Sequence, residues 1–182
     1  AASVIICSRN RRELLRDTVA SVLAGDRVPD EVIVVDQSDD ADPALAALGD
    51  DPASPVVYRH TTEVGLSRAR NTGARMARHP LLVYTDDDML LDPGWLGALV
   101  DTLVAAPPRT VVSGRVSAAP TDVPDGFAPS TIDDPDPVVH RGRIWQDVLY
   151  SGNMAIRAAD YHAVGGFDER LGPGTPFRSA ED

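Results

Sequence analysis

The segment Leu81-Leu82-Val83-Tyr84-Thr85-Asp86-Asp87-Asp88 decides the fold, because it joins an apolar run directly to three consecutive carboxylates. An apolar run of this length, bounded by polar residues, predicts a buried strand over 81–85. In open α/β sheets, ligands bind beyond the carboxyl ends of the strands, which is where the three aspartates would lie. A divalent cation such as Mg²⁺ or Mn²⁺ would offset their mutual repulsion. The triplet alone leaves a second interpretation open, a solvated acidic turn.

The same pattern extends along the chain on both sides of this segment. Apolar runs predict six strands, over 3–8, 31–36, 55–60, 81–85, 110–117 and 148–156. Helical periodicity predicts helices between them, over 11–24, 44–48, 67–78, 92–104 and 157–164. Because strands that alternate with helices form parallel sheets with right-handed crossovers, we predict a single α/β domain with a mostly parallel central sheet flanked by helices.

Local signals predict where three of these helices begin. Asn10 stands three residues before Glu13, a spacing typical of a capping box. Ser67 is a suitable N-cap for the helix over 67–78, and Pro93 is expected in the first turn of the helix that follows Asp92.

The charge and the cysteine content exclude several classes of partner. The chain has 182 residues, and 28 Asp and Glu against 17 Lys and Arg give a formal charge of −11. This charge would repel a phosphate backbone, so we expect no nucleic-acid partner. No run approaches the roughly 18 apolar residues that span a bilayer, so we expect no transmembrane segment. The single cysteine, Cys7, fits a reducing compartment, and we expect a cytoplasmic location.

The segment over 118–146 interrupts the alternation of strands and helices, since it is rich in Pro and Asp and lacks periodicity. Segments of this kind are usually functional or disordered, so a lid over a ligand and a mobile insertion both remain open. The chain starts at Ala1 and ends at Asp182 without a closing element, and we expect it to be an excerpt of a longer protein.

Acidic residues at two strand ends predict a site at one edge of the sheet. Asp36 ends the strand over 31–36, and the triplet ends the strand over 81–85, so both emerge at the same edge. Carboxylates bind a diphosphate only through a bridging cation, and Mg²⁺ characteristically joins one or two carboxylates to substrate phosphates. Arg70 is a candidate for a phosphate contact, or else for a surface ion pair, although its helix is expected to start near the opposite edge or in the crossover. Neither a GxxxxGK[ST] loop nor a GxGxxG motif occurs, which disfavours a classical NTPase or a dinucleotide-dependent oxidoreductase.

Several segments, taken in order, resemble the family 2 glycosyltransferases with a GT-A fold. The opening strand with Asn10 and the strand ending at Asp36 resemble the start of that family. Residues 65–73 are similar to the donor-site helix of the family, and residues 86–88 look like its Asp-x-Asp motif. Three later segments resemble its acceptor side: 152–153, 165–169 and 181–182. The resemblance covers nearly the whole chain and implies a nucleotide-sugar-binding half over 1–117, followed by a lid and acceptor-side half over 118–182.

The resemblance also implies an activity and a set of site residues. It implies an inverting glycosyltransferase that moves a sugar from a UDP-, dTDP- or GDP-sugar to a hydroxyl acceptor, with Mn²⁺ or Mg²⁺ as cofactor. It implies that the nucleotide-sugar is bound by Ser8, Asp36, Arg70, Asp86, Asp87 and Asn153. It implies further that Asp86 and Asp88 hold the metal and that Asp182 is the general base, which takes a proton from the acceptor hydroxyl.

Two alternatives to this enzyme remain open at the level of sequence. The proposed base, Asp182, is the last residue, so the chain could bind a nucleotide without turnover. A phosphotransferase or phosphatase with Asp36 as nucleophile is a weaker alternative, because Ser38 stands where such an enzyme needs a second acid. The sequence does not identify the sugar, the nucleotide base or the acceptor. It does not determine the oligomeric state.

Overall fold

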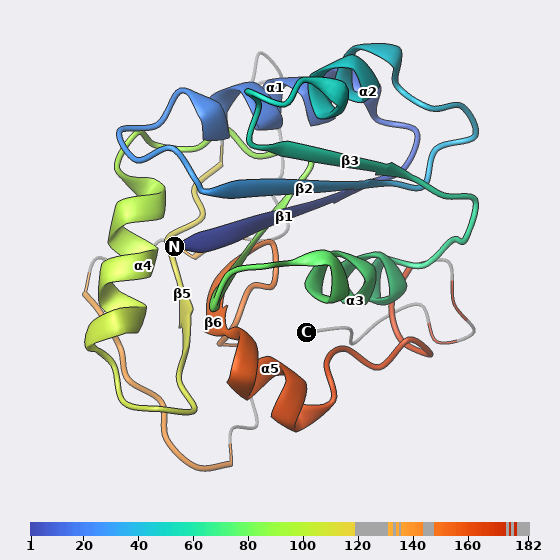
Figure 1. The fold of residues 1–182 in the computed structure, drawn as a ribbon. Helices are drawn as coiled ribbons and strands as arrows, with labels where there is room; N and C mark the ends of the chain where they lie inside the picture. Colours follow the sequence, from blue (N-terminus) through green and yellow to red (C-terminus); the bar gives the residue numbers. More distant parts are fainter. Residues whose placement is uncertain are drawn as a thin grey trace, which may run out of the picture.

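The computed structural model describes residues 1–118, 131–132, 134, 136–143, 148–173, 175 and 177. Six strands form one sheet in this part of the chain: β1 (Ala2–Ser8), β2 (Glu31–Asp36), β3 (Val56–His60), β4 (Leu81–Asp86), β5 (Val111–Ser113) and β6 (Asn153–Arg157). Five helices accompany them: α1 (Arg12–Leu23), α2 (Pro43–Asp50), α3 (Leu66–Met76), α4 (Trp95–Ala105) and α5 (Ala158–Val164) (Figure 1). None of these helices has both the length and the apolar character needed to cross a bilayer.

The sheet has the order β3-β2-β1-β4-β6-β5. Strands β1 to β4 are parallel to one another, which confirms the predicted α/β domain with a mostly parallel sheet. β6 pairs antiparallel with β4, and the short β5 pairs antiparallel with β6 at the edge. The strand predicted over 110–117 is shorter than expected, since β5 covers only Val111–Ser113, and the Gly114 N–H that follows donates to the Asn153 carbonyl at 3.2 Å.

Apolar side chains cover both faces of the central strands. On one face, alternate residues of β1 and β2 pack against α1, α2 and α4, and on the other face the intervening residues pack against α3 and α5. Figure 1 shows α1 and α2 above the strands and α3 and α5 below them. Because both faces are buried, the central strands are continuous apolar runs and do not alternate between polar and apolar residues.

The helix starts differ from all three local predictions. Asn10 adopts a positive φ of 57°, and its side chain bonds Asp39 in the neighbouring loop, so it does not cap α1. α3 begins after Gly65, whose φ of 136° is a conformation that other residues rarely adopt. Ser67 therefore lies inside α3, where its hydroxyl donates to the carbonyl of Leu171. Pro93 precedes α4, which starts at Trp95.

The register brings the predicted site residues to one edge. Ser8 pairs with Asp36, and Cys7 pairs with Asp86, at the carboxyl ends of β1, β2 and β4. The segment predicted as a lid falls largely outside the described residues. Within its described part, Ile132 forms an isolated antiparallel bridge with Val116.

Candidate functional site

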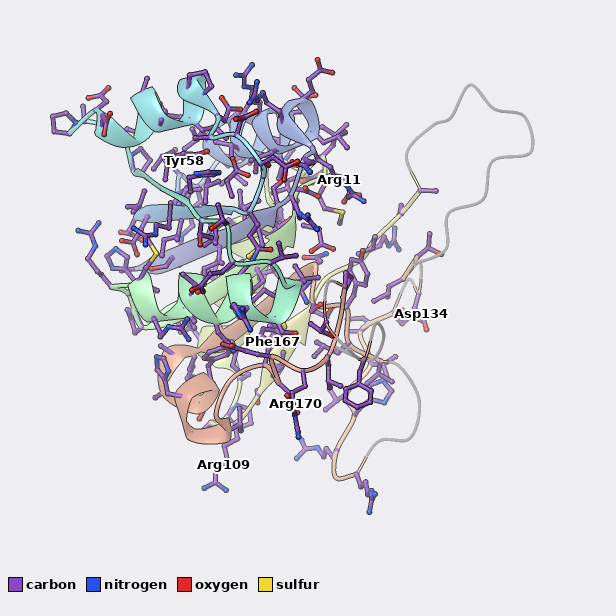
Figure 2. All side chains as sticks on the ribbon, turned by 90° about the vertical axis from the view of Figure 1, so that its right-hand side faces the viewer. Arg11, Tyr58, Arg109, Asp134, Phe167 and Arg170 are labelled. Atoms are coloured by element: carbon purple, nitrogen blue, oxygen red, sulfur yellow. The ribbon has the colours of Figure 1, made fainter. Side chains whose placement is uncertain are left out.

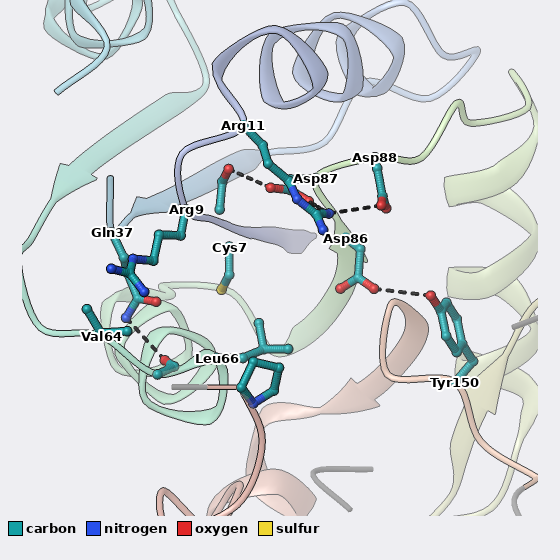
Figure 3. Close-up of a pocket in the computed structure, with 13 residues that line it drawn as sticks. Cys7, Arg9, Arg11, Gln37, Val64, Leu66, Asp86, Asp87, Asp88 and Tyr150 are labelled. Atoms are coloured by element: carbon teal, nitrogen blue, oxygen red, sulfur yellow. Dashed lines mark hydrogen bonds and ion pairs between the residues drawn. The ribbon is translucent and has the colours of Figure 1, made fainter. Parts of the chain in front are cut away.

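A cavity of about 380 Å³ opens at the carboxyl edge of the parallel strands (Figure 3). The loops after β1 and β2 and the start of α3 form one side of the cavity, and the aspartate triplet lies opposite them. Tyr150 and Pro173 complete the lining from the C-terminal part of the chain. Ser8 and the aspartate triplet, which lie at the ends of β1 and β4, thus line the same cavity.

The three aspartates of the triplet have different partners. Asp86 accepts hydrogen bonds from Arg70 Nη2 at 3.1 Å and from the Tyr150 hydroxyl at 3.3 Å. Asp87 is buried and accepts the Ser8 hydroxyl at 2.6 Å. Asp88 is the most exposed, with a side chain that is 44% accessible. The structure therefore brings Ser8, Arg70 and the whole triplet together.

Burial also sets the protonation behaviour of Asp87. Removal of this carboxyl from water raises its pKa above the usual value, while the hydrogen bond from Ser8 and the charge of Arg11 act in the opposite direction. The fold therefore disfavours the charged form of Asp87, and a pKa shifted by burial is typical of residues that bind a cation or a ligand.

Arg70 is a buried cation at the same edge as the triplet. It is 3% exposed, and its guanidinium carbon lies 5.2 Å from the centroid of the Phe167 ring. The expectation that its helix starts near the opposite edge was wrong, because α3 follows β3 and so begins where that strand ends. Seen from the side in Figure 2, Phe167 lies below α3, whereas Arg11 lies above the sheet, next to α1.

Gly152 allows Asp86 to occupy its position. A Cβ atom on Gly152 would lie 2.2 Å from Asp86 Oδ2 and 2.7 Å from the Tyr150 ring. The carbonyl of Gly152 also accepts the backbone N–H of Asp86 at 3.2 Å. The backbone before β6 therefore lies so close to the end of β4 that only glycine fits at position 152.

Besides the buried Arg70, two predicted donor-site residues, Asp36 and Asn153, lie outside the cavity lining. Asp36 is buried and accepts hydrogen bonds from the Ser38 N–H at 2.9 Å and the Tyr58 hydroxyl at 2.6 Å. Burial, together with this bond to Asp36, raises the pKa of Tyr58 to about 12. Asn153 accepts the indole N–H of Trp95 at 2.8 Å and donates to the carbonyl of Arg115. Both side chains thus have partners within the fold.

The lining includes Arg11, Gln37 and Tyr150, which the sequence did not single out. Gln37 directly follows the strand end at Asp36, and its amide donates to the carbonyls of Gly65 and Glu63. Its place after a strand end is a signal that could have revealed it. No comparable signal exists for Arg11 and Tyr150, because loop geometry alone turns them toward the triplet.

Asn71 connects α3 by hydrogen bonds to the segment 165–169, which resembles the acceptor side of the family. Its amide nitrogen donates to the Phe167 carbonyl at 2.9 Å and to Glu169 Oε1 at 3.0 Å. Its amide oxygen accepts the N–H of Phe167 and the hydroxyl of Tyr161. Gly166, with a φ of 75°, gives the chain room to turn here, since a Cβ atom would lie 2.7 Å from the Asn71 oxygen. Gly165 and Gly166 both adopt a positive φ in this turn.

The chemistry of the triplet fits a divalent cation that is shared with a ligand. Its carboxylates are the hard oxygen donors that Mg²⁺ and Mn²⁺ prefer. Within the described ranges, no group of three or more His, Cys, Asp or Glu side chains is arranged to hold a metal alone. A cation held here would complete its shell with water and phosphate oxygens, which is the usual arrangement for Mg²⁺. The predicted base, Asp182, lies outside the described residues.

Curated relatives of the chain transfer sugars. It is similar to the glucosyl-dolichyl phosphate glucuronosyltransferase of Haloferax volcanii, at 29% identity over 93% of this chain and 56% of that protein. Validoxylamine A glucosyltransferase of Streptomyces hygroscopicus subsp. limoneus is 25% identical over 92% of this chain and 44% of its own length. The chain thus spans about half the length of these relatives.

Solved structures resemble the domain as a whole. The mannosyltransferase PcManGT from Pyrobaculum calidifontis, in complex with GDP-Man and Mn²⁺, has a TM-score of 0.65 at 22% identity, over 94% of this chain and 48% of that one. S. aureus TarS 1-349, in complex with UDP-GlcNAc, has a TM-score of 0.64 at 18% identity, over 100% of this chain and 50% of that one. At these identities the likeness establishes the GT-A fold alone.

The family follows from a match that covers most of the sequence. The model of Glycosyl transferase family 2 matches residues 3–160, a span that runs from β1 into α5 and includes the triplet. The chain belongs to glycosyl transferase family 2, and its single α/β domain has the GT-A fold.

Proposed function

We propose that the chain is the catalytic domain of a metal-dependent, inverting glycosyltransferase that moves a sugar from a nucleotide-diphospho-sugar to a hydroxyl acceptor. The observation that carries the proposal is the cavity lined by the triplet, where Arg11 contacts Asp87 and Asp88 from the lining and the buried Arg70, outside the lining, contacts Asp86. A diphosphate needs positive charge around it, and carboxylates need a cation before they can approach it. Family membership and the nucleotide-sugars bound by the two similar structures support the same class of donor.

The residues of the cavity have distinct roles in this proposal. Asp86 and Asp88 hold Mn²⁺ or Mg²⁺, which supplies a Lewis acid for the negative charge that develops on the leaving diphosphate. Asp87 lies between the ribose and the metal, and Arg70 lies at the diphosphate. Ser8 keeps the Asp87 carboxylate in place through its hydrogen bond.

Sugar transfer in this proposal is a single displacement. Asp182 takes the proton of an acceptor hydroxyl as that oxygen attacks the anomeric carbon. The bond from the anomeric carbon to the diphosphate breaks on the opposite face, so the configuration inverts and a nucleoside diphosphate leaves. The roles of Asp36 at the base and Asn153 at the sugar remain proposals that require local rearrangement, because both side chains are bonded outside the cavity lining.

A phosphatase with Asp36 as nucleophile gains no support. Its two carboxylate oxygens accept hydrogen bonds from Ser38 and Tyr58, and the residue is 2% exposed. A nucleophile needs an accessible oxygen that points at its substrate. The accessible carboxylates of the cavity are those of the triplet.

Thermal unfolding with nucleotides and metals tests the proposal. UDP, GDP and dTDP are added in turn, each with and without Mn²⁺ or Mg²⁺. A ligand at 100 times its Kd stabilises a protein by about 2.7 kcal/mol, which for a chain of this size is a rise in Tm of about 5–10 °C. We expect such a rise for at least one nucleotide, and only with a metal present. Unchanged Tm values for all three nucleotides would contradict the proposal.

Assays of donor hydrolysis separate an enzyme from a binding module of the same fold. This chain and a longer form that continues beyond Asp182 are compared with the nucleotide-sugar whose nucleotide binds best. Turnover by both forms supports the complete mechanism. Binding without turnover by either form would favour the binding module.

A further inference from the structure

Arg11 connects two members of the triplet through one nitrogen. Its Nη1 lies 3.2 Å from Asp87 Oδ1 and 3.0 Å from Asp88 Oδ2, and both contacts are drawn in Figure 3. Arg11 belongs to the loop after β1, far from the triplet in sequence, and it precedes the first residue of α1. The two carboxylates thus share one guanidinium group, which lies at the place where the proposed cation would approach them.

The two arginines that contact the triplet, Arg11 and Arg70, differ in their freedom to move. The Arg70 side chain is 4% exposed and lies against Phe167, so it has little room to change its rotamer. The Arg11 side chain is 53% exposed, and its guanidinium contacts the triplet only through Nη1. A long exposed side chain that is held at one end turns at small cost, since exposed ion pairs contribute little to stability.

We propose that Arg11 is an exchangeable internal cation. It neutralises Asp87 and Asp88 while no divalent cation is bound, and it turns to the diphosphate of the donor once a cation has taken the carboxylates. This inference rests on the proposed function, because it assumes that the triplet binds a metal and the cavity binds a diphosphate. It adds a donor-binding residue, and it links metal binding to donor binding.

The charges in the cavity require such an exchange. The cation proposed at Asp86 and Asp88 and the Arg11 guanidinium at Asp87 and Asp88 share the Asp88 carboxylate, so the two positive charges repel each other at short range. Arg11 therefore weakens the binding of metal alone. The diphosphate brings further negative charge into the same cavity, and Arg11 can then pair with a phosphate oxygen. Metal and nucleotide should accordingly strengthen each other's binding by the same factor, as any coupling between two sites demands.

Arg11→Ala and Arg11→Gln test the exchange, with Arg12→Ala as a matched control. Arg12 is the next residue, and its replacement removes the same charge. Its contacts are Asp42 at 3.8 Å and the Ala41 carbonyl, both outside the cavity lining. Arg11→Gln keeps most of the side-chain length, and circular dichroism establishes that each variant is folded. Electron paramagnetic resonance of free Mn²⁺ gives the Kd for Mn²⁺ alone, and calorimetry at saturating Mn²⁺ gives the Kd for the best of UDP, GDP and dTDP.

The exchange predicts two shifts in opposite directions. Each Arg11 variant should bind Mn²⁺ alone about three- to ten-fold more tightly than the wild-type chain, and should bind the nucleotide at saturating Mn²⁺ about three- to ten-fold more weakly. Arg12→Ala should match the wild type in both measurements. If either shift is absent in the Arg11 variants, or if Arg12→Ala shows both shifts, the proposal is overturned. Failure of the wild-type chain to bind any of the nucleotides with Mn²⁺ would instead overturn the proposed function.

Discussion

Arg70 Nη2 lies 3.1 Å from Asp86 Oδ1, and this ion pair joins the first turns of α3 to the end of β4. Arg70 is almost fully buried, whereas the Asp86 side chain is 26% exposed at the cavity. The fold thus holds a fixed positive charge beneath the carboxylate that opens the triplet. A buried pair of this kind is sensitive to loss of one partner, because the remaining charge is left without compensation.

Arg70→Ala should destabilise the chain strongly. Loss of a partner from a buried ion pair costs about 3–5 kcal/mol, and the partial exposure of Asp86 places the expected loss at about 2–3 kcal/mol. Urea unfolding measures this change in the free energy of unfolding. Arg75→Ala on the same helix is the control, since that side chain is 61% exposed and should change stability by less than about 0.5 kcal/mol. If both substitutions change the free energy of unfolding equally, the buried ion pair contributes no more to stability than an exposed one.

Gly152→Ala should impair ligand binding more than folding. The added methyl group would lie 2.2 Å from Asp86 Oδ2, so the carboxylate must move away from its place in the cavity. We expect the metal-dependent Tm rise with nucleotide to fall by at least half. Gly97→Ala is the matched control, because nothing lies within 4 Å of the position that its methyl group would take on α4. That substitution should raise stability by about 0.5–1 kcal/mol and keep the full Tm rise. A full Tm rise in Gly152→Ala would argue against a ligand at Asp86.

Asn71→Asp should loosen the turn at Gly165 and Gly166. The substitution keeps the size of the side chain but replaces its donor with an oxygen that faces the Phe167 carbonyl and the Glu169 carboxylate. We expect a loss of about 2–4 kcal/mol in the free energy of unfolding. Hydrogen exchange at the amide of Phe167 should become faster. Thr72→Ala, which removes only an exposed bond to Arg75, should leave this amide protected. If the Phe167 amide stays protected from exchange in Asn71→Asp, the hydrogen bonds of Asn71 do not hold this turn in place.

Asp87→Asn should stabilise the chain at neutral pH while it weakens metal-dependent nucleotide binding. Burial raises the pKa of Asp87, so the ionised carboxylate is less favourable in the folded than in the unfolded chain. The wild type should therefore lose stability, relative to the variant, as the pH rises through the folded pKa. The difference should vanish below the usual aspartate pKa of about 4, where the residue is protonated in both states.

Urea unfolding of both chains at several pH values measures the effect of Asp87→Asn. Asp88→Asn serves as the control for loss of a charge beside Arg11, because that side chain is 44% exposed and its replacement should change stability little. An Asp87→Asn chain that is less stable than the wild type at neutral pH would show that the hydrogen bond from Ser8 and the charge of Arg11 outweigh the cost of burial.

Much of the donor-side half could be predicted because its signals are local. The apolar run that ends at Asp86 is buried on both faces, so sequence alone identified it as a central strand. The order of strands and helices then placed Ser8 and the triplet at one edge. The antiparallel placement of β6 was not predicted, because it depends on which strand β6 joins after a long irregular segment.

The details of the site depend on side-chain directions that a pattern does not encode. Asp36 ends a strand at the correct edge, yet its side chain bonds Tyr58 and not the cavity. The helix predicted over 11–24 included Arg11, but α1 begins at Arg12, and the path of the loop after β1 brings Arg11 to Asp87. Asn10 has the right spacing for a cap, but a competing bond to Asp39 in the adjacent loop determines its conformation.

A crystal structure with Mn²⁺ and the nucleoside diphosphate that raises Tm most tests the central claim directly. We predict electron density for the cation between the carboxylates of Asp86 and Asp88 and the phosphate oxygens, at metal–oxygen distances of about 2.1 Å. Arg70 should lie beside the diphosphate, within the cavity at the carboxyl ends of β1 and β4. A nucleotide bound away from this cavity, or bound in it with no cation at the triplet, would contradict the claim.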